Sequence, residues 1–299
     1  MSESQDHRTV LLLGRTGNGK STCANVIAGC DSDDPEQQLF RESETAVSET
    51  KDIHEKTIRI EWRRQTYHVT IVDTIGIGDT ALPKEEVLKS LSTICSKYKG
   101  GLSSVFFLVK GRMTKEEADA LDIICKVLFT PQICTVTTLI RTNFPGFMMP
   151  NKVSADIAAL EQDEPGRKVM SMVSNVIHID NPPLIYPHGK ETRAQSREAL
   201  LAKIVLSEQV YKPPEIAEVN KRISNYLEET ATAEEKIARM EAERVKAQKE
   251  LEIARKEAAA NEERARLARE EADRLRQENA LRRQRISHTH HSRSGCCIS

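Results

Sequence analysis

The feature that most constrains the fold is a short glycine-rich segment near the amino end. Residues 14–21 read Gly-Arg-Thr-Gly-Asn-Gly-Lys-Ser, the GxxxxGK[ST] spacing of a phosphate-binding loop. An apolar run at 9–13 precedes this segment and a helix-forming stretch at 21–27 follows it. In a strand, loop and helix arranged in this order, backbone N–H groups and the positive helix terminus can surround phosphate oxygens. The sequence therefore predicts an α/β nucleotide-binding domain.

Each residue of this loop is a candidate nucleotide contact. Lys20 is expected to reach the β and γ phosphates, and the Ser21 hydroxyl is expected to hold Mg²⁺. A chance match in an ordinary turn is the alternative, and the flanking strand and helix argue against it. The predicted nucleotide-binding residues of the loop are Gly14, Arg15, Thr16, Gly17, Asn18, Gly19, Lys20, Ser21 and Thr22.

A second motif follows about fifty residues later. The segments 57–62 and 67–72 have the pattern of a strand hairpin, and Asp73-Thr74-Ile75-Gly76 comes directly after them. An Asp at the carboxyl end of a central strand can hold Mg²⁺ through water, and the Gly76 N–H can touch the γ-phosphate. We therefore predict Asp73 as a metal-site residue and Gly76 as a nucleotide contact.

The polar segment 29–49 lies where the first switch loop of a P-loop protein belongs. A hydroxyl from this region would complete the metal site, and Thr45, Ser48 and Thr50 are the candidates. Their spacing does not choose among them. We predict Ser48 as the Mg²⁺ ligand, and a surface loop that supplies no ligand is the alternative.

The rest of the first 212 residues alternates between strand and helix patterns. Strands are expected at 103–109, 133–140 and 176–179. Helices are expected at 83–97, at 152–172 with a break at 165–166, and at 190–208. A further helix is expected to begin at a capping box formed by Thr114 and Glu117. This alternation predicts a doubly wound, mostly parallel sheet in a P-loop G domain spanning residues 1–212.

A charged helical extension is expected at 213–286, because no Gly or Pro occurs between Pro214 and Gly295. A heptad runs through this extension, but alanine fills most of its seam. Pairs such as Glu252 with Lys256 support the helix itself. A dimeric coiled coil and a free-standing charged helix therefore stay equally open.

The last residues, 287–299, are predicted to form a basic, disordered tail. They end in Cys296-Cys297-Ile298-Ser299, which fits a CaaX prenylation signal at Cys296. Nearby arginines would supply the second signal that one lipid chain needs at an anionic membrane. An unmodified tail that happens to end this way is the alternative.

Composition narrows the setting. The amino end resembles neither a signal peptide nor a myristoylation site, and the seven cysteines follow no disulfide framework. A net charge of −1 gives no general attraction to nucleic acid. We expect a cytoplasmic protein that the lipidated tail brings to the cytosolic face of a membrane.

Three segments together carry a family resemblance: Gly14–Ser21, Val72–Thr80 and Gly111–Glu117. In this order they resemble the immunity-associated nucleotide-binding (GIMAP, or avirulence-induced) GTPases, over about residues 8–205. The resemblance implies a septin-like and Toc-like G domain that binds GTP or GDP with Mg²⁺. It also implies self-association through the nucleotide face, often with a coiled-coil extension and a membrane anchor.

The base-recognition loop departs from the superfamily pattern. Where a [TN][KR]xD motif is usual, this chain has Arg141-Thr142-Asn143-Phe144, so Asn143 or Phe144 takes the Asp position. Asn lacks the charge that accepts two N–H bonds from guanine, so a weaker or relaxed base preference is expected. Asn181 resembles the base-contacting asparagine of the family's last loop, and a simple turn residue before Pro182 is its alternative.

The residue after Gly76 is Ile77, where a water-orienting glutamine is usual. A lone domain should therefore hydrolyse GTP slowly. An arginine from a paired protomer could supply the missing catalysis, with Arg112 first and Arg15 second, although Arg112 could also be a surface charge. The leading hypothesis is a membrane-tethered, slow or dimerisation-activated GTPase. A non-hydrolysing assembly module and a P-loop protein of relaxed base preference are the alternatives.

Overall fold

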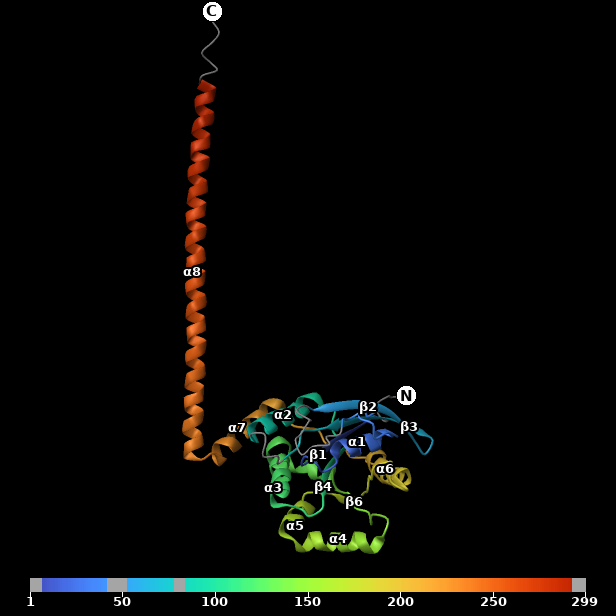
Figure 1. Cartoon of the computed structure of the whole chain (residues 1–299). Helices are drawn as coiled ribbons and strands as arrows, with labels where there is room; N and C mark the ends of the chain where they lie inside the picture. The colour runs from blue at the N-terminus through green and yellow to red at the C-terminus, as the bar shows by residue number, and fades with distance from the viewer. Residues whose placement is uncertain (1–6, 42–52, 78–83, 292–299) are drawn as a thin grey trace, which may run out of the picture. The chain divides into compact units, whose positions relative to one another are not determined.

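The computed structural model describes residues 7–41, 53–77 and 84–291. Six strands form one sheet in the order β2-β3-β1-β4-β5-β6 (Figure 1). Among the strands of the described residues, only the β2–β3 pair is antiparallel; the other neighbouring strands run parallel. This confirms the predicted doubly wound, mostly parallel sheet. The strands are β1 His7–Gly14, β2 His54–Trp62, β3 Gln65–Asp73, β4 Ser104–Lys110, β5 Thr137–Thr142 and β6 Asn175–His178.

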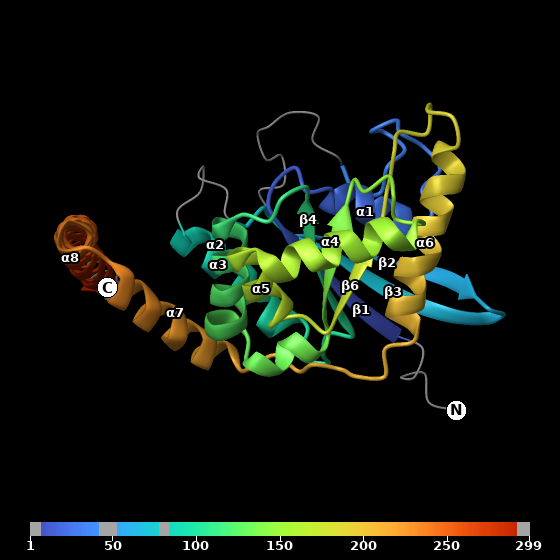
Figure 2. The same ribbon diagram turned by 90° about the horizontal axis from the view of Figure 1, so that it is seen from below.

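Helices cover both faces of the sheet. Along β1, Val10 and Leu12 face one core, and Leu11 and Leu13 face the other. The first core packs against α1 Lys20–Ala28 and α6 Gly189–Val205. The second core packs against α2, α3, α4, α5 and the turns after α3, and Figure 2 shows α5 beside α3. These elements are α2 Lys84–Lys97, α3 Lys115–Ile123, π-helix η1 Ile124–Leu128, 3₁₀-helix η2 Pro131–Thr135, α4 Pro150–Gln162 and α5 Glu164–Met170.

The predicted strand at 133–140 is wrong over its first part. Residues 131–135 form the 3₁₀ turn η2, and β5 begins at Thr137. Pro131 favours this turn because its φ is fixed near the helical value. The Ile133 N–H then bonds the Thr130 carbonyl at 2.9 Å, which ends any extended pairing there.

The predicted break in the helix at 165–166 lies two residues too late. Asp163 is extended, with φ −87° and ψ 136°, and separates α4 from α5. Pro165 then occupies the first turn of α5, where its missing N–H breaks no helical bond.

The two-residue turn between β2 and β3 has an unusual backbone. Arg63 and Arg64 both have positive φ, at 48° and 68°. Such turns normally carry Asn or Gly, because a Cβ is unfavourable in the left-handed region. The Arg63 guanidinium carbon lies 4.3 Å from the centre of the Trp62 ring, and the Trp62 indole N–H bonds Glu198 at 3.1 Å. These contacts fix the turn against α6.

Helix α7, Ile216–Thr230, belongs to the compact unit, which ends at Glu229. Val219, Ile223 and Leu227 recur every four residues and are buried in the second core. The Arg222 side chain donates to the Phe129 carbonyl at 2.7 Å. The sequence placed the start of the extension at residue 213, so the compact unit is longer than that expectation by the length of this amphipathic helix.

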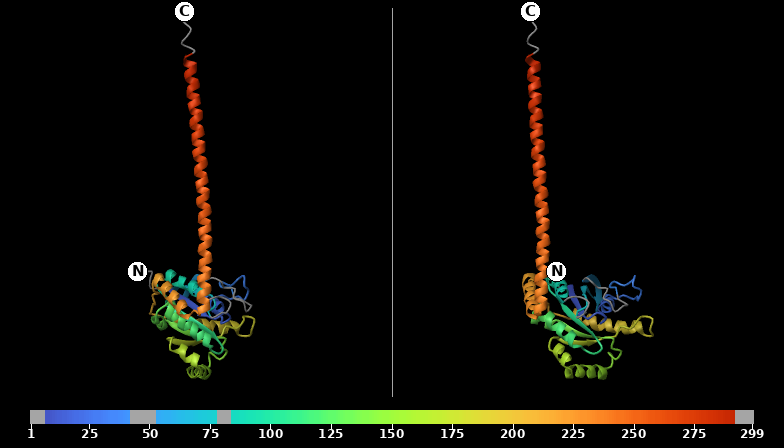
Figure 3. Two further views of the ribbon diagram at one scale, coloured as in Figure 1. Left: turned by 90° about the vertical axis from the view of Figure 1, so that its left-hand side faces the viewer. Right: turned by 60° about the vertical axis from the view of Figure 1, so that its left-hand side comes forward.

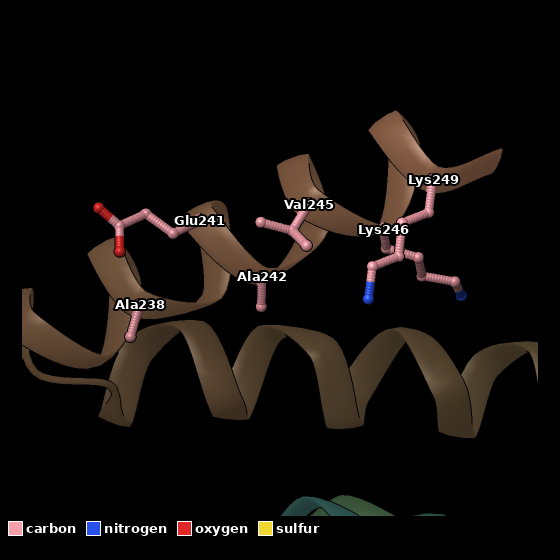
Figure 4. A pocket seen from close by; sticks show the side chains of 6 residues that line it. All are labelled: Ala238, Glu241, Ala242, Val245, Lys246 and Lys249. Carbon is pink, nitrogen blue, oxygen red and sulfur yellow. The ribbon is translucent and has the colours of Figure 1, made fainter. Parts of the chain in front are cut away.

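The second unit begins at Thr230 and contains α8, Ala233–His291, a single helix that Figure 3 shows without a break. Ile237, Met240 and Leu251 are exposed on it. Figure 4 shows a shallow hollow on the surface of α8, lined by Ala238, Glu241, Ala242, Val245, Lys246 and Lys249. Among the described residues, no helix combines the length and the apolar character needed to cross a bilayer.

Candidate phosphate-binding site

The segment 14–19 leaves β1 and enters α1 as an open loop. Gly14, Gly17 and Gly19 have φ values of 149°, 83° and 81°, a region that side chains disfavour. A Cβ on Gly14 would lie 2.5 Å from the Leu108 carbonyl oxygen, so this glycine is also needed for the close contact with β4. The three glycines of the motif therefore occupy backbone positions that residues with a Cβ disfavour.

Lys20 lies almost fully buried at the start of α1. Its ammonium group donates to the carbonyls of Gly14 and Arg15, at 3.0 and 3.3 Å. These bonds hold the positive charge within the loop. The Arg15 side chain is exposed on the loop, and the Thr22 side chain is partly buried in α1.

Asp73 lies at the carboxyl end of β3, next to the first turn of α1. Its Oδ2 accepts from the Ser21 hydroxyl at 2.7 Å, and its buried Oδ1 has no hydrogen-bond partner. Burial raises the pKa of Asp73, although the Ser21 bond and the Lys20 charge partly oppose that shift. Burial and the Asp73 charge also raise the pKa of the Cys23 thiol, which is therefore a core residue and not a reactive one.

These two side chains fit Mg²⁺. Carboxylate and hydroxyl oxygens are its preferred ligands, and Mg²⁺ usually keeps several waters instead of a full protein cage. The unpartnered Asp73 Oδ1 offers an acceptor for such a water beside Ser21. The described residues contain no group of three or more His, Cys, Asp or Glu side chains that could hold a metal.

Gly76 approaches the phosphate loop closely. A Cβ at this position would lie 2.0 Å from Thr16 Oγ1 and 2.8 Å from the Thr16 nitrogen. The Ile77 N–H donates to the Gly14 carbonyl at 3.1 Å, while the Ile77 side chain is buried in the second core. Thr16 Oγ1 is itself buried without a partner, so an unused hydroxyl lies between the two segments.

Asn18 connects the loop to the rest of the sheet edge. Its side-chain amide donates to the Leu108 carbonyl at 2.9 Å and to Glu117 Oε1 at 2.7 Å. Its carbonyl accepts from the Thr142 hydroxyl at 3.0 Å. Glu117 was expected only as part of a capping box; the box is present, but the contact with the loop was not foreseen.

The two segments predicted to recognise the base, the loop at 141–144 and the turn at Asn181, lie next to each other. The Phe144 N–H donates to the Ile179 carbonyl at 3.1 Å, next to Asn181. Asn143 is exposed with φ 53°, a backbone that Asn tolerates better than most residues. The Asn181 side-chain oxygen is buried without a partner. An unmet acceptor of this kind suits the amino or ring N–H of a base.

A buried ionic cluster that is not evident from local sequence patterns lies beside these segments. Arg141 binds Asp156 of α4 through two hydrogen bonds of 2.9 Å, and His178 lies 2.8 Å from the same carboxylate. Burial alone would raise the pKa of Asp156, but the bonds from Arg141 and His178 outweigh it and lower that pKa. The His178 ring also packs against Phe144, at 4.7 Å between centroids.

The predicted catalytic arginine Arg112 lies on the loop after β4. Its side chain is 87% exposed and pairs with Asp163 at 3.4 Å. Such an exposed pair is weak, so the guanidinium can leave it at little energetic cost.

Four predicted residues lie outside the described part of the chain. They are the switch candidates Thr45, Ser48 and Thr50, and the lipidation candidate Cys296.

Curated relatives cover only part of this chain. Immune-associated nucleotide-binding protein 13 of Arabidopsis thaliana is 28% identical over 140 residues, which is 46% of this chain and 38% of that protein. Immune-associated nucleotide-binding protein 7 of the same plant is 23% identical over 204 residues, 67% of this chain and 61% of that protein. This chain thus spans about 38% and 61% of the lengths of these two relatives.

Among solved structures, Toc33 from Arabidopsis thaliana in complex with GDP and Mg²⁺ is similar at 14% identity, with a TM-score of 0.46, over 69% of this chain and 88% of that one. The model of the AIG1 family matches residues 8–183, which include the phosphate loop, Asp73, Gly76 and the Gly111–Glu117 segment. That match spans more than half of the sequence, and the chain belongs to the AIG1 family.

Proposed function

We propose that this protein binds GTP and GDP with Mg²⁺ at the loop of residues 14–21. The observation that carries the proposal is the arrangement at Asp73, whose Oδ2 meets Ser21 at 2.7 Å while Oδ1 is buried and unpartnered beside the phosphate loop. A buried carboxylate in this position needs a cation or a polar ligand to satisfy it.

The remaining residues take roles by their place around the loop. Lys20 would exchange its carbonyl partners for the β and γ phosphates, and Gly76 would offer its N–H to the γ-phosphate. Asn143 and Asn181 would contact the base, with Asn181 supplying an acceptor oxygen. Because neither carries a charge, the preference for guanine over adenine should be smaller than that given by an aspartate.

Calorimetric titration tests this proposal. Wild-type protein should bind GTP and GDP, and the affinity should rise when Mg²⁺ is added. Lys20→Ala should lose most of that binding, whereas Lys89→Ala, which removes an exposed lysine of α2, should bind as wild type does. If titration of the wild type with each purine triphosphate neither releases nor absorbs heat, the proposal is ruled out.

We further propose that hydrolysis is slow in one protomer and faster when two G domains meet at their nucleotide faces. Ile77 is buried and cannot orient a water, so an added group is needed. Arg112 is the first choice for that group because it is exposed and weakly held, and Arg15 is the second.

A non-hydrolysing assembly module is the second candidate, and the buried Ile77 favours it. Single-turnover hydrolysis over a range of protein concentrations separates the two. A rate per protomer that rises with concentration, and stays flat in Arg112→Ala, supports catalysis in trans. Arg59→Ala, at an exposed position on β2, is the matched control. A flat, negligible rate in every protein supports the assembly module.

We also propose that the extension and tail tether the protein to the cytosolic face of a membrane. Apolar residues on α8 fall along two stripes, one through Ile237, Met240 and Leu251 and one through Ala242 and Val245. Self-association of α8 would bury one of them.

Mass spectrometry after expression in a eukaryotic cell tests the lipid on Cys296. Intact, unmodified carboxyl ends would remove the anchor from the proposal, and a monomeric α8 in sedimentation would remove the coiled coil.

A further inference from the structure

The Gly111–Glu117 segment carries a contact that the proposed function does not use. Glu117 is only 4% exposed, although it is a carboxylate. Its Oε2 accepts from the Thr114 N–H at 3.0 Å, which is the capping box of α3, and its Oε1 accepts from the Asn18 amide at 2.7 Å. One carboxylate therefore serves the start of a helix and the middle of the phosphate loop.

The orientation of the Asn18 side chain is fixed by its partners. Both neighbours of its amide, the Leu108 carbonyl and the Glu117 carboxylate, can only accept hydrogen bonds. The amide must therefore present its NH₂ group to both of them, and a flipped amide would place two acceptors together. Because one acceptor is charged, this bond is among the stronger ones available to an amide.

The Asn18–Glu117 contact lies between two glycines of the phosphate loop. Gly17 and Gly19 flank Asn18, and both lie in the region of backbone conformation that glycine enters freely. The Asn18 N–H bonds the Arg15 carbonyl at 3.2 Å, and the Asn18 carbonyl bonds Thr142 at 3.0 Å. Side chain and backbone of one residue thus tie the loop to β4, β5 and α3. Without the hydrogen bonds of the Asn18 side chain, the two glycines on either side of Asn18 would allow the loop many conformations.

We propose that Glu117 is a positioning residue for phosphate binding, acting through Asn18. By holding Asn18, it keeps the backbone N–H groups of the loop directed at the β-phosphate before the ligand arrives. The inference rests on the proposed function, because it concerns the same loop. Glu117 would then have two roles: it helps to cap α3 together with Thr114, and it preorganises the phosphate loop for its ligand.

Glu117→Gln is the central test, measured by calorimetry with GDP and with GMP. A Gln has one acceptor oxygen, so it can serve Thr114 or Asn18 but not both, and its NH₂ group would face a donor. Affinity for GDP should fall by about 10- to 100-fold, the effect of losing a charge-assisted hydrogen bond that orders the loop. GMP has no β-phosphate, so its affinity should change by less than about 3-fold. Asn18→Ala should reproduce the same selectivity.

Two variants separate positioning from simple stability. Glu116→Gln changes the exposed neighbour in the same helical turn and should leave both affinities unchanged. Thr114→Ala removes the hydroxyl that caps the Glu117 N–H but keeps the Glu117 contact with Asn18. It should lower the melting temperature while leaving the ratio of GDP to GMP affinity as in the wild type.

The outcomes are distinct. If the wild type binds GDP and Glu117→Gln binds it equally well, or loses GDP and GMP affinity in the same proportion, the positioning role is refuted while nucleotide binding stands. If Glu117→Gln does not fold, Asn18→Ala gives the same decision from the other side of the contact. If the wild type binds no guanine nucleotide, the proposed function itself fails.

Discussion

Removing the carboxylate of Asp156 should unfold the compact unit at a markedly lower temperature. Arg141 is 7% exposed, and both of its hydrogen bonds to Asp156 measure 2.9 Å. Asp156→Ala would leave a buried guanidinium without these bonds, which costs about 3–5 kcal/mol. For a domain of this size each kcal/mol lowers the melting temperature by about 2–4 °C, so a fall of about 6–20 °C is expected.

Thermal unfolding followed by tryptophan fluorescence measures this fall directly. Trp62 is the single tryptophan of the chain, and it lies within the compact unit, so α8 does not contribute to the signal. Asp119→Ala is the matched control, because it removes an exposed partner of Lys168 from another helix. It should cost less than about 1 kcal/mol.

A double variant and a pH series complete the test. Arg141→Met with Asp156→Leu replaces the ion pair by apolar side chains and should recover part of the lost stability, although His178 still loses its Asp156 partner. The bonds that lower the pKa of Asp156 stabilise the folded state above the ordinary carboxyl pKa of about 4, and this stabilisation is lost as the pH falls through the lowered value. The difference between wild type and Asp156→Ala should therefore be the same at pH 7 and pH 5. A melting temperature for Asp156→Ala within the range of the Asp119→Ala control would refute the reasoning.

Four further predictions concern the nucleotide site. Asp73→Asn should abolish the effect of Mg²⁺ on GTP affinity and leave the Mg²⁺-free affinity within about 3-fold. Because burial raises the pKa of Asp73, protons compete with the metal at higher pH than they do for an ordinary carboxylate. The affinity of the wild type for Mg²⁺ should therefore weaken as the pH falls through that raised pKa. An affinity that does not change between pH 8 and about 4 would contradict this. Gly76→Ala should lower GTP affinity at least about 10-fold in a titration, because the added Cβ would lie 2.0 Å from Thr16 Oγ1. An affinity equal to that of the wild type would show that the Gly76 segment and the phosphate loop are not held together. Asn143→Asp should raise the ratio of GTP to ATP affinity in competition by about 10-fold or more, and an unchanged ratio would exclude Asn143 from base recognition.

Local spacing was enough to predict the phosphate loop. The glycines, Lys20 and Ser21 lie within eight residues, and their geometry follows from the strand and helix on either side. Asp73 was also predictable, because a hairpin places the end of β3 beside β1 in any fold of this class. Whether these residues bind the nucleotide stays a prediction.

The supporting contacts were not predictable, because they depend on how distant elements pack. Asp156 lies on α4, and only the position of that helix against β5 and β6 brings it to Arg141 and His178. Glu117 has the same character: its capping role is local, but its contact with Asn18 joins residues 99 positions apart. The docking of α7 was missed for a different reason, since its apolar spacing also fits the heptad that runs into α8.

The turn between β2 and β3 has a consequence for engineering. Two successive arginines, Arg63 and Arg64, hold a left-handed backbone that costs about 1–2 kcal/mol for each residue with a Cβ. An Asn-Gly pair adopts the same turn with far less strain. This tip lies in the β2–β3 hairpin, outside the phosphate loop and the base-recognition segments. It is therefore a place where a more heat-resistant form of the protein can be built without altering the residues that would contact a ligand.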